Sequence, residues 1–253
     1  MTDKGSEFFD AASFFDRYAD TPVYGNTEQG PRDWDICFIK FIKENLTGNT
    51  LLDVGAGTGF FAGLVKQNIV DMQVTAFDPS ERLLSKIEDQ SIKKVIGELP
   101  DLNLDPDETF FFIHVRNVLH HLVGRTVNES RNRVKESLLA LRDHLDDSGF
   151  LMILDEHWEG QVIPTSSRTL VFFLLSVARR LNIKFPHRLH LKGLIVCFYT
   201  ISELENMFKD CGFEVLQFRD FPLPNNRLKK LLFLKRWGRM LFIVRKASDQ
   251  PIS

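Results

Sequence analysis

The chain has 253 residues, of which 43% are hydrophobic and 26% charged, as is ordinary for a globular protein with a substantial core. Its net charge of −2 gives no overall attraction to nucleic acid or membranes. The three widely spaced cysteines, Cys37, Cys197 and Cys211, argue against a disulfide framework or a zinc site and favour a reducing, cytoplasmic location.

The first residues have an amphipathic, polar character over 6–20 and again over 31–46. They lack the basic start and apolar core of a secretory signal, so we expect none. We expect residues 1–46 to form a helical segment over the active site. The most apolar run, 169–178, is about half the ~20 residues that a spanning helix needs.

Short apolar runs alternate with helical patterns from residue 50 onward. The runs predict strands at 50–54, 73–77, 93–97, 110–115, 150–155, 213–218 and 239–246. Strands that are apolar on both faces and alternate with helices are typical of a parallel sheet covered on both sides.

A helix is predicted before the fifth strand, because four apolar residues there recur at the spacing of one helix face: Val134, Leu138, Leu141 and Leu145. A second helix is predicted near 202–212, with a capping box at Ser202 and Glu205 or, equally, at Thr200 and Glu203. Residues 159–198 fit no sheet element, and we expect a partly helical insertion over the carboxyl edge of the sheet.

The stretch "LLDVGAGTGF" at 51–60 places Gly55, Gly57 and Gly59 directly after the first strand. Glycines at such a turn let the backbone approach a ligand closely. A dinucleotide fingerprint would have a small residue where this chain has Phe60, and a P-loop would continue with Gly-Lys-Ser/Thr. The pattern instead fits D-x-G-x-G-x-G, beginning at Asp53.

This motif resembles the first motif of the class I S-adenosylmethionine-dependent methyltransferases. "VTAFDPS", "VIGELPDL" and "LRDHLDDSGFLMILDE" are similar to later motifs of that family, although Ser148-Gly149 replaces a pair of glycines. "HVRNVLHHL" is similar to the ubiquinone/menaquinone-biosynthesis branch. The resemblance covers residues 47–158 and 198–246. It implies a Rossmann-like α/β fold with a seven-stranded, mostly parallel sheet, helices on both faces and an antiparallel last strand.

We expect four parts of the chain: the segment 1–46, a cofactor-binding core at 47–158, a helical lid at 159–198, and a last helix with two strands at 199–253. The implied cofactor is S-adenosyl-L-methionine, and no metal is expected. Its binding residues would be Asp53, Gly55, Ala56, Gly57, Gly59, Asp78, Pro79, Glu98, Leu99, Asn117 and His121. Asp78, at the end of the second strand, suits the ribose hydroxyls.

Three residues after the fourth and fifth strands are candidates for catalysis: His120, Glu156 and His157. Transfer of a methyl group from a sulfonium mainly requires alignment, and a base helps only if the acceptor must lose a proton. A structural role for the histidines, and a surface corner at 155–157, remain alternative interpretations.

The apolar insertion favours a small, largely apolar acceptor, with O-methylation preferred to C-methylation. A homodimer through the insertion is the alternative. The fourth strand is not followed by the proline-containing loop of enzymes that methylate nucleic-acid bases, which argues against nucleic acid.

Residues 227–246 contain eight basic and no acidic residues. This run is typical of a solvated hairpin, but it also fits contact with an anionic membrane or with RNA. An RNA or protein methyltransferase, or a cofactor-binding scaffold without turnover, therefore remain alternative functions.

Overall fold

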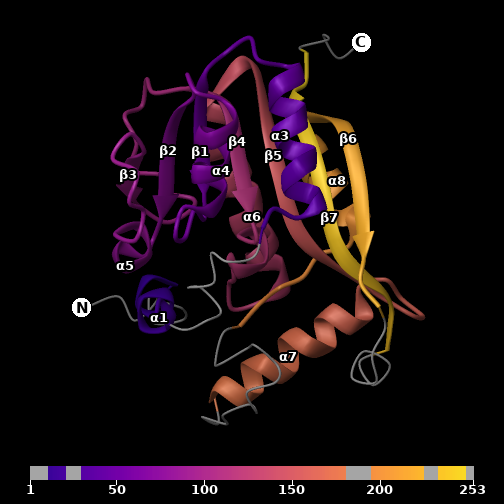
Figure 1. The fold of residues 1–253 in the computed structure, drawn as a ribbon. Coiled ribbons are helices and arrows are strands. Elements are labelled where there is room, and N and C mark those ends of the chain that lie inside the picture. Colours follow the sequence, from indigo (N-terminus) through magenta and orange to yellow (C-terminus); the bar gives the residue numbers. More distant parts are fainter. Residues whose placement is uncertain (1–10, 21–29, 181–194, 225–232, 249–253) are drawn as a thin grey trace.

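The computed structural model describes residues 11–20, 30–180, 195–224 and 233–248 (Figure 1). Seven strands form one sheet in the order β3-β2-β1-β4-β5-β7-β6. The strands are β1 (Thr50–Val54), β2 (Gln73–Asp78), β3 (Lys93–Ile96), β4 (Phe110–Arg116), β5 (Leu145–Gly160), β6 (Phe213–Pro222) and β7 (Leu234–Lys246). Strands β1 to β5 are parallel, and β7 is antiparallel to both neighbours. The predicted Rossmann-like sheet is confirmed.

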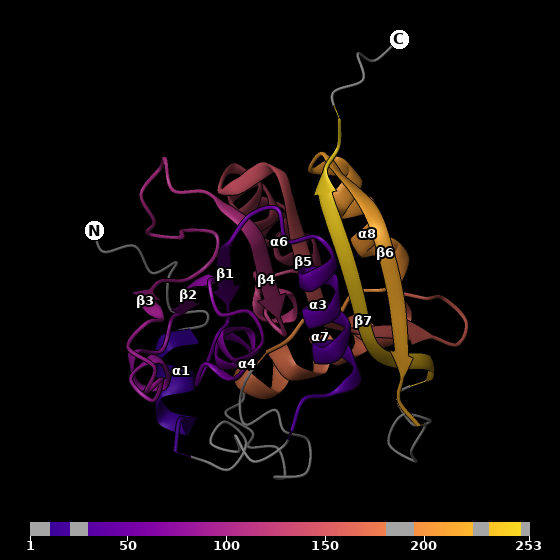
Figure 2. The same ribbon diagram turned by 45° about the horizontal axis from the view of Figure 1, so that its top comes forward.

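Helices cover both faces of the sheet (Figures 1 and 2). α3 (Asp33–Glu44) and α4 (Phe60–Asn68) pack on one face, and α6 (Val127–Asp143) and α8 (Ile201–Asp210) pack on the other. Neighbouring residues of β1 point to opposite cores, with Leu51 in the first and Leu52 in the second. Two-sided burial explains why the parallel strands are apolar runs rather than alternating ones.

The remaining helices lie near the carboxyl ends of the parallel strands. They are α1 (Ala11–Tyr18), the short α5 (Glu81–Leu84), the 3-10 turn η2 (Leu119–His121) and α7 (Ser166–Arg180). In Figure 1, α1 and α7 both lie beyond this edge. No helix in the described ranges is long and apolar enough to cross a membrane.

Strand β5 differs most from its predicted bounds. It begins at Leu145, which was expected to end the preceding helix, and it runs to Gly160 instead of 155. Beyond Leu154 it pairs with β7, from the register Asp155↔Met240 to Gly160↔Leu234. Backbone bonds to β7 hold this extension, so it does not need the continuous apolar pattern of a buried strand.

The structure also shows which of the two predicted capping boxes begins α8. Thr200 Oγ1 accepts from the N–H of Glu203, and the Glu203 carboxylate accepts from the N–H of Thr200. Tyr199, just before this cap, forms an isolated parallel bridge with His157. The chain therefore contacts the sheet directly after the predicted insertion.

Candidate active site

The glycine turn after β1 has the backbone that its sequence predicts. Gly55, Gly57 and Gly59 have φ values of +73°, +54° and +77°, in the left-handed region that favours glycine. A Cβ at Gly55 would lie 2.4 Å from Val118 Cγ2, and one at Gly59 would lie 2.7 Å from Ile87. A Cβ at Gly57 would meet nothing within 4 Å. The turn is thus packed at its two ends and open at its middle.

Asp78 lies beside the open part of the turn. Its Oδ2 accepts from the N–H of Gly57 and its Oδ1 from the N–H of Ser80, both at 2.9 Å. Burial raises the pKa of Asp78 to about 6, although these two backbone bonds oppose the shift. The carboxylate therefore stands where the motif predicts the acid that binds ribose hydroxyls.

Asp53 has a partner that the motif alone does not reveal. Its Oδ1 lies 2.7 Å from His114 Nδ1, and both side chains are buried. The register of β1 and β4 places these two residues side by side. Asp53 Oδ2 is buried without a partner in the described part of the chain. Because the two residues lie 61 positions apart, the pair follows from strand pairing and not from a local pattern.

The end of β4 presents two further polar atoms that lack partners among the described residues. These are Asn117 Oδ1 and His121 Nδ1, and both are buried. Asn117 has a φ of +53°, and its N–H donates to Leu154 O. Burial, with a smaller contribution from the neighbouring His120, holds the pKa of His121 well below its usual value. Buried polar atoms of this kind usually bind water or a ligand.

The other predicted cofactor residues lie around the same edge. Ala56 is half-buried in the turn, and its N–H donates to Phe77 O. Pro79 is half-buried directly after Asp78. Leu99 is buried, whereas Glu98 is exposed and forms an isolated bridge with Asp101. The glycine opening and the orphaned polar atoms fit a ligand with hydroxyl and amino groups, as the proposed cofactor has.

Helix α1 reaches this edge at two points. Ser80 Oγ donates to the Asp16 carboxylate, and Arg82 donates to the carbonyl oxygen of Asp16. Phe15 meets the His121 ring edge-on, with 5.5 Å between the ring centroids. The helix therefore connects the end of β2 with the segment that follows β4.

His120 forms a buried pair with Asp155, which the sequence interpretation did not single out. The ring Nδ1 of His120 lies 2.5 Å from Asp155 Oδ1, and the backbone N–H of His120 donates to Asp155 Oδ2. Burial disfavours the imidazolium, but attraction and hydrogen bonding to Asp155 outweigh burial and raise the pKa of His120. A tenth of the His120 side chain remains exposed. An acid at the end of the predicted strand 150–155 was visible in the sequence, but its partner was not.

The other two catalytic candidates have different surroundings. His157 is fully buried, and its Nε2 lies 2.8 Å from Asp220 Oδ1 on β6. Its Nδ1 is buried with no partner in the described ranges. Glu156 is half-buried and faces Arg239 across the β5–β7 register. Of the two histidines, His120 alone keeps part of its ring side chain accessible.

Aromatic rings continue from His120 along the edge. Phe198 stacks on His120 with centroids 5.3 Å apart, and Trp158 stacks on Phe198 at 4.3 Å. The N–H of Cys197 donates to His120 O and fixes this segment beside η2. The end of the insertion thus supplies an apolar wall next to the imidazole.

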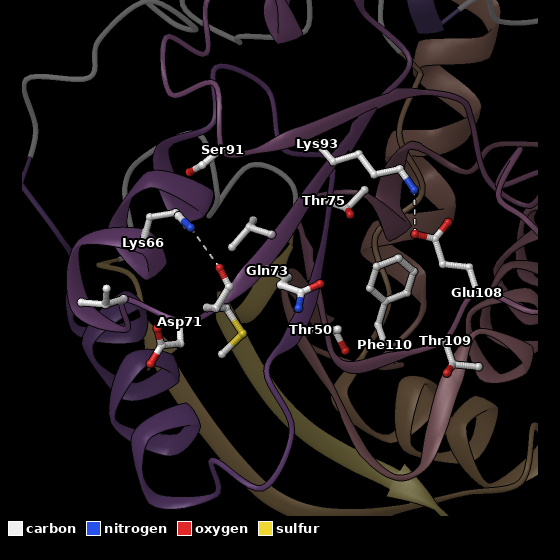
Figure 3. Close-up of a pocket in the computed structure, with 13 residues that line it drawn as sticks. Thr50, Lys66, Asp71, Gln73, Thr75, Ser91, Lys93, Glu108, Thr109 and Phe110 are labelled. Atoms are coloured by element: carbon white, nitrogen blue, oxygen red, sulfur yellow. Dashed lines mark hydrogen bonds and ion pairs between the residues drawn. The ribbon is translucent and has the colours of Figure 1, made fainter.

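A pocket of about 520 Å³ lies elsewhere, at the amino edge of the sheet (Figure 3). Its two lysines already have partners, since Lys66 Nζ donates to Met72 O and Lys93 Nζ pairs with Glu108. The residues of the glycine turn and of the His120–Asp155 pair do not line it. No group of three or more His, Cys, Asp or Glu in the described ranges is placed to bind a metal.

Comparisons with known proteins agree with this geometry. A family model described as a methyltransferase domain matches residues 28–218. No curated protein matches the chain in sequence.

Solved structures share the fold at low identity. The CcbJ methyltransferase from Streptomyces caelestis has a TM-score of 0.61 and 15% identity, covering 95% of this chain and 100% of that one. An S-adenosylmethionine-dependent methyltransferase from Clostridium acetobutylicum has a TM-score of 0.56 and 14% identity, covering 93% and 98%. A phosphoethanolamine N-methyltransferase of Haemonchus contortus, in complex with S-adenosyl-L-methionine, has a TM-score of 0.65 and 12% identity, covering 96% and 61%. With its matched domain and strand order, the chain belongs to the class I S-adenosylmethionine-dependent methyltransferases, enzymes whose cofactor is S-adenosylmethionine.

Proposed function

We propose that the enzyme methylates a small, largely apolar metabolite, and that oxygen is the preferred acceptor atom. The observation that carries this proposal is the His120–Asp155 pair beside the aromatic wall of Phe198 and Trp158. A hydroxyl acceptor needs a base, and an aromatic wall favours a flat, apolar body.

The chain's own residues divide the work in this proposal. Gly57 and Asp78 hold the cofactor, which supplies a methyl group on a positively charged sulfur. Asp155 orients His120 through Nδ1 and leaves Nε2 to take the acceptor's proton. Helix α1 and the described parts of the insertion, 159–180 and 195–198, cover the site and exclude water.

The raised pKa of His120 determines the pH dependence of this chemistry. The base must be neutral, so turnover rises with pH through the pKa of His120. In the Asp155→Asn variant the carboxylate is lost and burial remains, so the pKa falls and the rising limb moves to lower pH.

The test is a labelled-methyl assay with four acceptor classes: apolar phenols, apolar carbon acids that lack a hydroxyl, an RNA, and a peptide. We expect label on the phenol oxygen, a turnover loss of about 10²- to 10⁴-fold in His120→Asn, and unchanged cofactor affinity. The matched control is His144→Asn, because His144 caps the end of α6, just before β5, and its Nδ1 contacts Glu108 O.

Label on RNA or peptide alone would overturn the acceptor class. Label on carbon alone would overturn the preference for oxygen. Cofactor binding without transfer to any of the four classes, or to a metabolite extract, would favour a scaffold that has no turnover.

A further inference from the structure

Arg239 on β7 carries a positive charge that has no ion-pair partner in the described ranges. The residue is half-buried, and its Nε is buried without a hydrogen-bond partner among the described residues. Its guanidinium lies over the Trp34 ring, with 4.4 Å between Cζ and the ring centroid. In Figures 1 and 2, α3, which carries Trp34, lies against β5 and β7. A cation withdrawn from water is normally paired with a carboxylate, so Arg239 lacks its usual anion.

Two carboxylates act on Arg239 electrostatically, but neither is bonded to it. Glu156 faces Arg239 across the β5–β7 register, yet their side chains form no ion pair in the described structure. Asp35 is fully buried and accepts from Arg116 Nη1 at 2.9 Å. Burial, the largest influence, lowers the pKa of Arg239; Glu156 opposes this shift, and the like charge of Arg116 adds to it. The surroundings of the guanidinium therefore favour the uptake of an anion.

The chemistry of the stacked pair indicates which kind of group it would take. Trp34 Nε1 is also buried without a partner in the described part of the chain. Arginine and tryptophan can only donate hydrogen bonds, so the missing partner has to be an acceptor. A guanidinium binds the two oxygens of a carboxylate side by side. The neighbouring Glu156 disfavours the double charge of a phosphate.

Arg239 lies on the acceptor side of the sheet. In the strand order β1-β4-β5-β7 it is three strands from the glycine turn, or about 14 Å at ordinary strand spacing. Asp155, which orients His120, pairs in register with Met240, the residue after Arg239. Burial and Asp155 dominate the pKa of His120, but Glu156 also raises it and Arg239 lowers it. The charge of Arg239 therefore reaches the proposed base.

Arg239 and His120 lie on different faces of the sheet, as their contacts with Trp34 and Phe198 show. The last β5 residue that pairs with β4 is Leu154, and the next bridge on this side is at His157. Residues 155–156 thus have no strand beside them there in the described ranges. A flat acceptor across this interval can present a hydroxyl to His120 and a carboxylate to Arg239.

We propose that Arg239 binds a carboxylate of the methyl acceptor. The inference rests on the proposed function and narrows it to an apolar body with a hydroxyl at one end and a single carboxylate at the other. Arg239 is then a substrate-binding residue, and Trp34 holds its guanidinium in place.

The test is titration calorimetry on the full chain saturated with S-adenosylhomocysteine. The probes are para-hydroxybenzoate and para-hydroxyphenylpropanoate, which differ in the distance from hydroxyl to carboxylate, each with its methyl ester. We expect at least one acid to bind about 10- to 100-fold more tightly than its ester. In Arg239→Gln this preference should vanish, because the acid loses affinity and the ester does not. A purely structural role would lower both affinities equally.

The matched control is Arg245→Gln. Arg245 lies near the other end of β7 and pairs with Glu214, so its loss should leave the acid preference unchanged. Urea denaturation and the affinity for S-adenosylhomocysteine show whether each variant is folded. The preference of the original chain for acid over ester is measured without any substitution.

Equal binding of acid and ester, an acid preference that survives in Arg239→Gln, or no binding of any probe would overturn the carboxylate site. So would a matching loss of S-adenosylhomocysteine affinity in Arg239→Gln, because the guanidinium would then hold the cofactor's own carboxylate. Failure of the proposed function has a different signature. An acid preference that is lost in Arg239→Gln, without methyl transfer to the phenol, would support this site and count against O-methylation.

Discussion

Gly57 is the residue at which an added methyl group tests whether the cofactor approaches the turn. In Gly57→Ala the Cβ enters the open side of the turn, and we expect the affinity for S-adenosylhomocysteine to fall at least about tenfold. The left-handed φ should also lower the free energy of unfolding by about 1–2 kcal/mol. Titration calorimetry and urea denaturation measure the two effects.

Gly63 provides the control for this substitution. A Cβ there also meets nothing within 4 Å, but Gly63 lies inside α4 at an ordinary helical φ. Gly63→Ala should therefore keep full affinity and gain a few tenths to about 1 kcal/mol of stability. If Gly57→Ala also keeps full affinity, the ligand does not approach the turn.

We expect Asp78 to make cofactor binding depend on pH. With burial raising its pKa to about 6, the carboxylate is charged above pH 6 and becomes protonated below it. Only the charged form accepts both ribose hydroxyls, so the affinity for S-adenosylhomocysteine should fall as pH drops through about 6. Below pH 6 the affinity should fall by at most about tenfold for each pH unit.

The Asp78→Asn variant tests whether this residue causes the pH dependence. Its affinity should be lower than that of the original chain at pH 7.5 and nearly constant between pH 5 and 7.5, as followed by calorimetry. Asp89→Asn, at an exposed turn, is the matched control. An unchanged pH dependence in Asp78→Asn would place the titrating group elsewhere.

The glycine turn and the position of Asp78 beside it were predictable because each lies within a few positions of a strand end. Asp53–His114 and His120–Asp155 were not predictable as pairs. The first depends on the register of β1 against β4, and the second joins a residue after β4 to one in β5. Such contacts are set by sheet pairing, which local patterns do not contain.

At the scale of elements, α7 is joined to α8 by a buried ion pair. Arg168 Nη1 donates to both oxygens of Glu203, at 2.7 and 2.8 Å, and the two side chains are 5% and 12% exposed. Arg168→Leu removes the nearer cation from a largely buried carboxylate and leaves only Arg131 Nη1 at 4.0 Å, so we expect a loss of about 3 kcal/mol in the free energy of unfolding.

An exposed ion pair on α3 provides the control for the Arg168 variant. Lys40 and Glu44 on α3 are 72% and 58% exposed, and Lys40→Ala should change stability by less than about 0.5 kcal/mol. Urea denaturation measures both variants. Similar small losses would mean that the Arg168–Glu203 pair does not hold the two helices together.

Element positions were predictable where burial dictates the sequence pattern. The bounds of β1 are those expected, because both faces of this strand are covered. The predicted helix wrongly included Leu145, and the predicted bounds of β5 and β7 were too short. Backbone hydrogen bonds between those two strands hold residues whose pattern mixes polar and apolar side chains. α7 was expected only as part of an insertion, since its apolar residues lie on both sides and leave no single face to recognise.

At the scale of the whole molecule, the overall composition did not show how charge is distributed along the chain. A net charge of −2 argued against a charged partner, yet residues 160–202 and 221–248 contain 14 basic and no acidic residues. The described parts of these two segments touch where Ser167 Oγ donates to Phe233 O. Whole-chain averages cannot show such a separation, because it appears only when contacts between distant segments are known.

Strand β6 closes one side of the sheet, and in the described part of the chain β7 is its one neighbour. The unpaired backbone groups of such an edge strand can form hydrogen bonds with a strand of another molecule. Here the pairing register shifts between Val215 and Gln217, with Leu216 as the extra residue, and Arg219 follows close by. A bulge and a charged side chain both disfavour pairing with a foreign strand, and deleting Leu216 should restore the regular register and expose the edge to such pairing.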